Sequence, residues 1–346
     1  MWGEEAPGSP QGPSHTEFHA GPLSSPGMNQ TLNGSWNPEQ ALSASEVDAL
    51  HVVYLAASSL AMFTSVCGAA GNGAVVWLLS VGVQRTPFCT YILNLAVADL
   101  LFLLCMASML TLETPSLADS HTKVHEVVMR VMYFAYTASL SLLTAISVQR
   151  CLSVLFPLWY KCRRPRHLST VVCSLLWALA LLMNTLTTLF CLRFWRHDEG
   201  RCFTVDTAMG TLIMGVFTPA MTVSGITLYV RVRRSALLWR RRPRRLLVVI
   251  LASILVFLVG SLPLGIYWFV LFWLPLPREA KLLYICLSRL SSAISSSANP
   301  VIYFLVGSQR TRRLAESLKV VLGRALQEEP EPGGRETPST GPSEGL

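Results

Sequence analysis

Long apolar stretches alternate with shorter polar segments along most of the chain. Each stretch is long enough for a helix that crosses a bilayer, because about 20 residues of helix span roughly 30 Å. The pattern predicts an all-α membrane protein, a seven-transmembrane helix bundle. The predicted spans are residues 53–80, 88–112, 127–155, 168–190, 206–230, 246–273 and 280–306.

The third span carries an arginine near each end. Between Arg130 and Arg150 all residues are apolar, small, hydroxylated or aromatic until Gln149. A helix of this length is roughly 30 Å long, so one guanidinium lies at each face of the membrane. We therefore expect Arg130 to face a ligand on one side and Arg150 a protein partner on the other.

The placement of charge predicts the orientation in the membrane. The chain of 346 residues is 51% hydrophobic and 14% charged, whereas soluble domains contain about 25% charged residues. Its net charge is +8, yet residues 1–51 contain no Lys or Arg. Basic loops lie on the cytoplasmic side, so the N-terminus is expected outside the cell, and nucleic-acid binding is disfavoured. The basic clusters are residues 161–166, 231–245 and 310–324.

The segments outside the spans complete the expected organisation. The N-terminal segment is rich in Pro, Gly and Ser, which predicts disorder, and its sequons at Asn29 and Asn33 predict glycosylation. After the last span, an apolar helical face bordered by basic residues predicts a helix that lies on membrane lipids. The expected domains are residues 1–51 (disordered, extracellular), 52–306 (transmembrane bundle), 307–326 (amphipathic membrane-surface helix) and 327–346 (disordered cytoplasmic tail).

Polar residues inside the spans are costly in a bilayer and need partners. Asp99 lies near the middle of the second span, where Asn72, Ser139, Asn299, water or a sodium ion is expected to solvate it. Prolines in a helix remove a backbone hydrogen bond and allow a kink. The prolines expected to allow such kinks are Pro219 in the fifth span, Pro263 in the sixth and Pro300 in the seventh.

Two of the nine cysteines, Cys191 and Cys202, flank the polar loop between the fourth and fifth spans. They are the best candidates for a disulfide if that loop is extracellular. Most other cysteines lie within apolar runs and are expected to be small buried hydrophobic residues. No cysteine spacing indicates a metal site, and no cofactor is expected.

Two other classes of membrane protein fit the sequence less well. Transporters usually contain internal repeats and paired broken helices, and the sequence has no evident repeat. An intramembrane enzyme would need a catalytic constellation, but HExxH and GxSxG are absent and Asp99 has no second catalytic aspartate in a neighbouring span. The chain is therefore not expected to be an enzyme.

The polar and proline positions, taken in order, resemble those of rhodopsin-like G-protein-coupled receptors. These positions are Asn72, Asp99, Arg150, Trp177, Pro219, Pro263 and the NPVIY run that ends at Tyr303. The stretches YFAYTASLSLLTAIS, QRCLSVLFP, SLPLGIYWFVL and SSSANPVIYFLVGS are similar to those of the Mas-related receptors. The resemblance implies a plasma-membrane receptor and implies that Cys191 and Cys202 form a disulfide.

Some positions depart from the usual rhodopsin-like pattern. Gln149 replaces the acid before the arginine of span three, and Cys151 replaces the tyrosine after it. Ser261 stands where a tryptophan usually precedes the span-six proline, and His125 where a cysteine usually begins span three. Gln149 can accept a hydrogen bond from Arg150 but cannot neutralise it. We therefore expect appreciable signalling without ligand.

The ligand is expected between spans three, five and six. A guanidinium at Arg130 and a carboxylate at Asp206 could hold the two ends of a small zwitterion, and the resemblance implies a β-alanine-like amino acid. The aromatic residues expected to line this site are Trp268, Trp273 and, with weaker support, Tyr133. Simpler interpretations also fit: Arg130 as a cation that reaches lipid headgroups, Asp206 as a helix cap, Arg130 and Asp206 as a pair with each other, and the tryptophans as an interfacial belt.

At the inner face, Arg150, Gln149 and Tyr303 are the residues expected to couple to a G protein. The resemblance implies Gq- and Gi-type G proteins, with arrestin as a further partner, and a place in nociceptive sensory neurons. The alternative is a peptide-responsive or constitutively active receptor of the same family. Charged residues near the outer mouth that a peptide could use are Glu126, Arg193 and Arg201.

Overall fold

The computed structural model describes residues 38–81, 87–113, 122–163, 165, 167–191, 199–239, 245–271 and 274–308. Within this part of the chain the regular structure is entirely helical. The first four long helices are α1 (Pro38–Val81), α2 (Pro87–Leu112), α3 (Thr122–Leu155) and α5 (Leu168–Cys191), with the short α4 (Pro157–Cys162) after α3. The fifth span consists of α7 (Glu199–Leu212), η1 (Ile213–Phe217) and α8 (Thr218–Trp239). The sixth consists of α9 (Arg245–Gly260) and α10 (Leu262–Phe269), and the seventh is α11 (Arg278–Ser308).

These helices confirm the predicted seven-transmembrane bundle. By length and composition, six described segments are apolar enough to cross a membrane, from the first span through the sixth. The seventh, α11, falls outside that set because charged residues and several serines interrupt its apolar sequence. It nevertheless packs along α1, α2 and α9 as an integral part of the bundle.

The first helix begins earlier than the sequence predicted. It starts at Pro38, so residues 38–51 are helical although a disordered segment was expected up to residue 51. Pro38 is the first helical residue, a position that suits proline, and the next turns are rich in Ala, Glu and Leu, which favour helix. The sequons at Asn29 and Asn33 and the expected amphipathic helix and tail lie outside the described residues.

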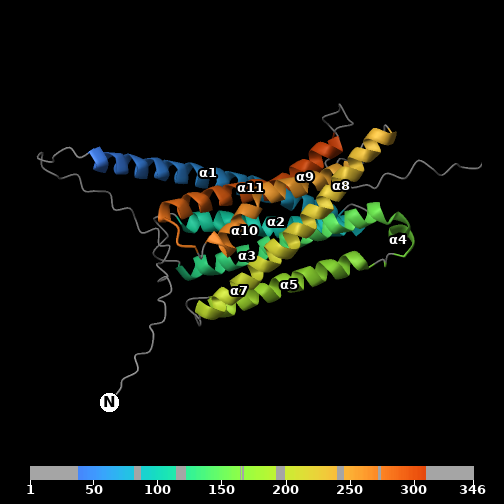
Figure 1. Ribbon diagram of the computed structural model, residues 1–346, viewed down its shortest axis with the longest axis horizontal. Coiled ribbons are helices and arrows are strands. Elements are labelled where there is room, and N and C mark those ends of the chain that lie inside the picture. Colours follow the sequence, from blue (N-terminus) through green and yellow to red (C-terminus); the bar gives the residue numbers. More distant parts are fainter. Residues whose placement is uncertain are drawn as a thin grey trace, which may run out of the picture.

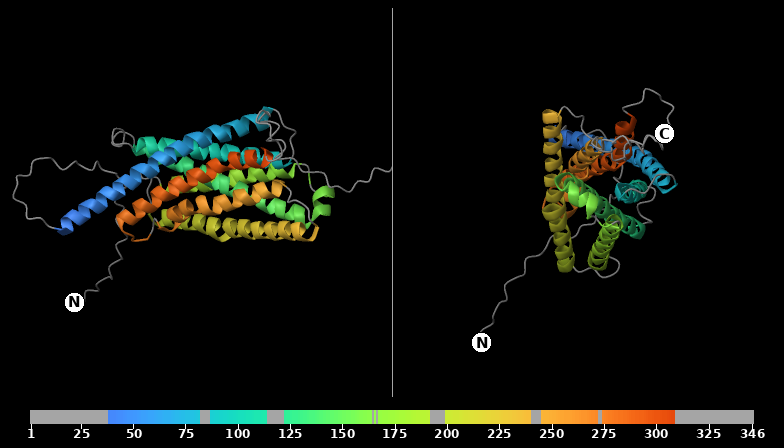
Figure 2. Two further views of the ribbon diagram at one scale, coloured as in Figure 1. Left: turned by 90° about the horizontal axis from the view of Figure 1, so that it is seen from above. Right: turned by 90° about the vertical axis from the view of Figure 1, so that its right-hand side faces the viewer.

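The bundle is elongated, and its helices run roughly along the long axis (Figures 1 and 2). The third helix is central: α3 packs against α2, α5, α8 and α9. It is also the most buried of the candidate spans, with 72% of its apolar window inside the protein. The span that carries an arginine near each end therefore lies at the centre of the bundle.

Prolines interrupt two spans. Pro219 follows the wide turn η1, where the Thr218 hydroxyl donates to the Ile213 carbonyl at 2.8 Å. In the sixth span the helix stops at Gly260 and restarts at Leu262, next to Pro263. Proline has no N–H to donate and therefore leaves backbone carbonyls without a helical partner. The helix is interrupted beside Pro263, as expected of proline, and hydroxyl groups of neighbouring helices donate to the Gly260 and Ser261 carbonyls.

Candidate functional site

Two ends of the bundle contain the residues predicted to function. The Cys191 end, at the left of Figure 1, contains the last residues of α2 and α5 and the first residues of α3, α7 and α11. The Tyr303 end contains the first residues of α2 and the last residues of α3 and α11. Arg130 lies in the α3 segment toward the Cys191 end and Arg150 toward the Tyr303 end, as predicted.

Arg130 is held by the end of α5. Its Nη2 donates to the Cys191 carbonyl at 3.2 Å, and its Cζ lies 5.9 Å from the centre of the Tyr133 ring. Its Nε is buried and has no hydrogen-bond partner in the part of the chain that the structure describes. A buried N–H without a partner costs about 1–3 kcal/mol. The guanidinium is therefore fixed in place with a donor left to bind something else.

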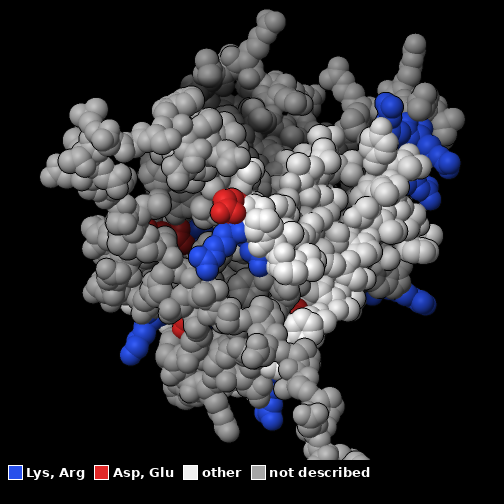
Figure 3. All heavy atoms as spheres, turned by 60° about the vertical axis from the view of Figure 1, so that its left-hand side comes forward, with Lys and Arg blue, Asp and Glu red and all other residues white. Residues whose placement is uncertain are grey.

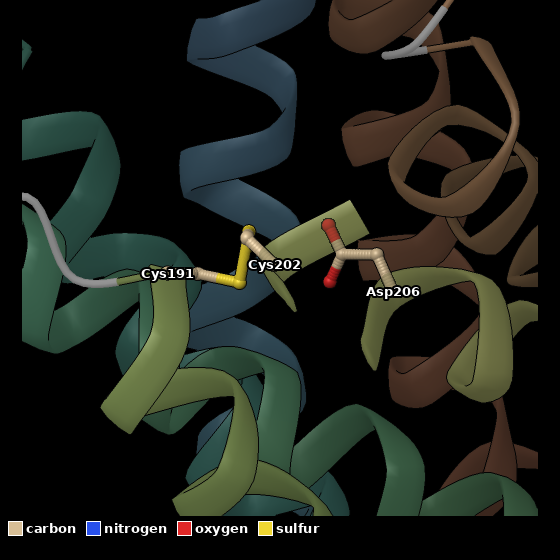
Figure 4. A group of neighbouring side chains, drawn as sticks. All are labelled: Cys191, Cys202 and Asp206. Atoms are coloured by element: carbon tan, nitrogen blue, oxygen red, sulfur yellow. A yellow bond between two sulfur atoms is a disulfide. The ribbon is translucent and has the colours of Figure 1, made fainter. Parts of the chain in front are cut away.

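Asp206 lies beside the disulfide (Figure 4). Cys191 and Cys202 are bonded with their Cα atoms 4.9 Å apart, which confirms the predicted pair. An Asp206 carboxylate oxygen lies within 4.8 Å of both sulfur atoms. This group is not a metal site, because both sulfur atoms are already bonded to each other. The cap interpretation of Asp206 is wrong, because α7 begins at Glu199 and Asp206 lies inside the helix.

Three aromatic rings connect this region to the bend in the sixth span. Tyr133 stacks on Trp268 with their ring centres 4.0 Å apart, and Trp268 meets the edge of Tyr136 at 5.3 Å. Both Arg130 and Asp206 are close enough to the Tyr133 hydroxyl to act on it electrostatically. Trp268 is 5% exposed, so its interpretation as an interfacial belt residue is wrong. The structure thus brings together four of the five predicted ligand residues, while Trp273 lies outside the described residues.

Hydroxyl groups bind the carbonyls of the span-six bend. The Tyr136 hydroxyl donates to the Ser261 carbonyl at 3.1 Å, and the Ser291 hydroxyl donates to the Gly260 carbonyl at 2.7 Å. A Cβ on Gly260 would lie 2.8 Å from Ser295 Cβ and 2.9 Å from the Ser291 carbonyl oxygen, so only glycine allows this approach of α11. The bend is therefore tied to α3 and to α11.

Asp99 forms the polar centre of the bundle. It is 1% exposed, and its two oxygens accept hydrogen bonds of 2.7 Å from Ser139 and Asn299. Both partners were predicted. Asn72 instead donates to the Gly68 carbonyl in its own helix and to the Ser296 carbonyl at 3.1 Å, and so joins α1 to α11.

A charged cluster at the Cys191 end was missed by the sequence reasoning. Glu113, just after α2, accepts from Arg289 Nη1 at 2.7 Å and from the Tyr54 hydroxyl at 3.4 Å, and its other oxygen lies 3.3 Å from His125 Nε2. Burial by itself would raise the pKa of Glu113, but Arg289 and then His125 oppose it and lower the pKa from 4.5 to about 2. Figure 3 shows acidic and basic side chains side by side near the middle of this end.

One signal could have revealed this cluster. Arg289 lies inside the predicted seventh span, and a charge within a span requires a partner. Glu113 directly follows the second span and was therefore a candidate. The cluster connects α1, α3 and α11 through a single carboxylate.

At the Tyr303 end, aromatic residues of α2 contact the polar residues of α3. Gln149 Nε2 donates to the Tyr91 hydroxyl at 2.8 Å. Arg150 Cζ lies 4.2 Å from the centre of the Phe88 ring, and Arg150 is only 4% exposed. Tyr303, on α11, is 2% exposed. The three residues predicted to couple to a partner therefore lie at one end of the bundle, and Arg150 is buried there.

A bundle of seven such helices, with a polar centre and proline bends, is the architecture of a seven-transmembrane receptor. Residues 71–303 match the family described as 7 transmembrane receptor (rhodopsin family). The human Mas-related G-protein coupled receptor member D is 63% identical over 318 residues, which cover 92% of this chain and 99% of the human protein. The Macaca fascicularis member D is 62% identical over 317 residues with the same coverage, and the rat Proto-oncogene Mas is 37% identical over 282 residues, or 80% of this chain and 85% of its own length.

The chain belongs to the Mas-related G-protein-coupled receptors of the rhodopsin family. It is therefore a multi-pass signalling receptor of the plasma membrane that acts through G proteins, and it is not an enzyme.

Proposed function

We propose that this receptor is activated by a small amino acid whose ammonium and carboxylate are separated, such as β-alanine. The carboxylate binds Arg130, the ammonium binds Asp206, and Tyr133, Trp268 and Trp273 surround the carbon chain between them. In this arrangement the Cys191 end faces the outside of the cell and the Tyr303 end faces the cytoplasm.

The observation that supports this proposal most strongly is the state of the Arg130 guanidinium. Its Nη2 is already bound to the Cys191 carbonyl, while its Nε is buried without a hydrogen-bond partner among the described residues. A ligand carboxylate at the Nε edge would satisfy this donor and form a charge-assisted hydrogen bond. Guanidinium groups suit carboxylates because their N–H groups form a planar fork.

Asp206 supplies a charge of the opposite sign at the same end of the bundle. It is 8% exposed and lies on α7, whereas Arg130 lies on α3. Both lie near enough to the Tyr133 hydroxyl to act on it electrostatically, so a ligand that spans the two charges would lie against this side chain. A ligand with two opposite charges at its ends complements such a pair, and a simple amine or a simple acid does not. The family resemblance points to the same ligand class.

Binding is transmitted through the contacts between the Tyr133, Trp268 and Tyr136 rings. A ligand that contacts Tyr133 or Trp268 changes the position of the Trp268 ring, which meets Tyr136. Tyr136 in turn binds the Ser261 carbonyl at the span-six bend. The sixth span can then swing about Pro263 and make Arg150 and Tyr303 available to the C-terminal helix of a Gq- or Gi-type α-subunit. The ligand acts only through its stronger binding to the swung arrangement.

The test compares two ligands on the parent receptor and three variants. Asp206→Asn keeps the size of the side chain and removes its charge. Arg130→Gln also removes the charge and leaves a shorter polar side chain, while Arg201→Gln makes the same change at an exposed arginine of the same end. Loss of a buried charge partner costs about 2–5 kcal/mol, or about thirtyfold to several thousandfold in β-alanine potency. Arg201→Gln should keep the parental potency.

The amide of β-alanine identifies which charge each residue binds. The amide lacks the carboxylate, so its potency should be low on the parent and should not fall further in Arg130→Gln. If Arg130→Gln or Asp206→Asn reaches the cell surface and keeps full β-alanine potency, the site is misassigned. A loss confined to Arg201→Gln, with response to peptides, would instead favour the peptide-responsive alternative.

A further inference from the structure

The cytoplasmic half of the bundle lacks the acids that usually restrain the span-three arginine. Arg150 is 4% exposed, and a buried guanidinium needs compensation for its lost hydration. Gln149 occupies the neighbouring position where an acid usually stands. The sequence has no Asp or Glu at residues 49–98, 127–197, 207–278 or 280–315. The acids that the predicted spans do contain are Asp99, near mid-depth, and Asp206, at the Cys191 end, so the spans supply no acid at the level of Arg150.

An aromatic ring lies against this guanidinium instead. Arg150 Cζ is 4.2 Å from the centre of the Phe88 ring, and Phe88 is 5% exposed. Because both groups are shielded from water, the negative face of the ring attracts the cation strongly. This contact joins the first turn of α2 to the last turns of α3.

A second contact between α2 and α3, a hydrogen bond, lies one helical turn further along α2. Tyr91 is 1% exposed and accepts a 2.8 Å hydrogen bond from Gln149 Nε2. Residues three apart lie on the same helical face, so Phe88 and Tyr91 form one aromatic surface. That surface contacts two successive residues of α3, Gln149 and Arg150.

We propose that Phe88 and Tyr91 form an aromatic clamp that replaces the usual ion pair and holds Arg150 away from the G protein. In the clamped arrangement Arg150 is covered, so a partner protein cannot contact its guanidinium. Coupling therefore requires Arg150 to leave the Phe88 ring, and any change that weakens this contact increases signalling without ligand. The proposal rests on the coupling role of Arg150, but it does not depend on the identity of the ligand.

The decisive experiment weakens the negative electrostatic potential of the Phe88 ring face while changing the shape of the ring little. Phenylalanine with one, two or three ring fluorines is incorporated at position 88 of the full-length receptor. Each fluorine weakens the attraction of the ring for a cation. Complete loss of a desolvated cation–π contact is expected to shift the ratio of clamped to free receptor about thirtyfold, which converts to about 2 kcal/mol.

Two readouts follow the clamp in different ways. Ligand-free nucleotide exchange on Gq and Gi heterotrimers, measured with purified receptor in nanodiscs, should rise stepwise with each fluorine. The melting temperature of the receptor alone should fall in the same order, and this measurement needs no G protein. Tyr91→Phe, which removes the hydroxyl that Gln149 contacts, should also raise ligand-free exchange.

Phe102 provides the matched control. It lies on α2, is 2% exposed, and its ring neighbours the Tyr136 ring at 6.3 Å. The same fluorinated residues at Phe102 should produce no stepwise trend in exchange. If exchange and melting temperature are independent of fluorination at Phe88, the ring only packs there and the clamp is refuted. The series is repeated in an Arg130→Gln background, where the trend should persist even if the proposed ligand site is wrong.

Discussion

Glu113→Gln replaces a partly buried carboxylate that connects three helices by a neutral side chain of the same size. The Glu113 and Arg289 side chains are 18% and 15% exposed, and Glu113 Oε2 lies 2.7 Å from Arg289 Nη1. The pKa of Glu113 falls from 4.5 to about 2 in the folded receptor. At 1.36 kcal/mol per pKa unit, this difference corresponds to about 3 kcal/mol. Removing one member of a buried ion pair costs a similar amount, about 3–5 kcal/mol.

The measurement is a double-mutant cycle. Glu113→Gln, Arg289→Gln and the double variant are unfolded reversibly in mixed lipid and detergent micelles by adding a denaturing detergent. Each single variant should lose about 3 kcal/mol of unfolding free energy, and the double variant should lose much less than the sum. A coupling energy below about 0.5 kcal/mol would show that the pair is no stronger than a surface salt bridge and would refute this reasoning.

The pH dependence gives an independent check with a definite sign. The folded pKa of Glu113 lies below the unfolded one, so its contribution is fully present above about pH 4.5 and is lost as pH falls toward 2. The groups that face this carboxylate are Arg289, His125 and Tyr54. A His125→Asn background removes the imidazole from this cluster. In that background, the receptor with Glu113 and the Glu113→Gln variant should differ in unfolding free energy by a constant amount from pH 8 to 5. The difference should become smaller below pH 4.5. A gap that widens on acidification would contradict the assignment.

Three further predictions concern the signalling elements. Gln149→Asp supplies the missing acid beside Arg150 and should lower ligand-free signalling at equal surface expression, and an unchanged signal would count against a role for this position. Tyr136→Phe removes the hydroxyl that donates to the Ser261 carbonyl, a contact of about 1 kcal/mol. It should alter the maximal response to the proposed agonist β-alanine more than the affinity for it. A signalling assay measures the response, and a radioligand assay measures the affinity. Replacing sodium by choline should change agonist potency in the parent but not in Asp99→Asn, and equal effects in both would exclude Asp99 as a sodium ligand.

The sequence predicted those features that depend on local composition. The seven spans follow from apolar runs, and the Cys191–Cys202 pair follows from two cysteines that flank one polar loop and from the family resemblance. The bend near Pro263 follows from the missing backbone N–H of proline. Ser139 and Asn299 were identified as partners of Asp99 because a buried carboxylate needs donors. The spans follow from the length of the apolar runs, and the partners of Asp99 follow from the cost of a buried polar group without a hydrogen bond.

The features that the sequence did not predict depend on how helices face one another. Nothing in the order of residues shows that the Phe88 ring lies over Arg150, because the rotation of α2 against α3 is set by packing along their whole length. Arg289 was recognisable as a charge inside a span, yet its depth and therefore its pairing with Glu113 required the bundle. The helical start at Pro38 was missed because the composition of the whole N-terminal segment outweighed its last, helix-favouring turns.

In the proposed mechanism the sixth span and Arg150 move, and the contacts that restrain both of them are made by neutral groups. The Ser261 carbonyl is bound by a tyrosine hydroxyl, and Arg150 lies against the Phe88 ring. Each such contact contributes about 1–2 kcal/mol. The restrained receptor and the receptor with a swung sixth span and a released Arg150 should therefore differ little in free energy. A ligand of six non-hydrogen atoms gains at most about 9 kcal/mol of binding free energy, and only the part that differs between arrangements can shift the equilibrium. Weak neutral restraints are therefore what allows a ligand as small as the proposed amino acid to switch the receptor.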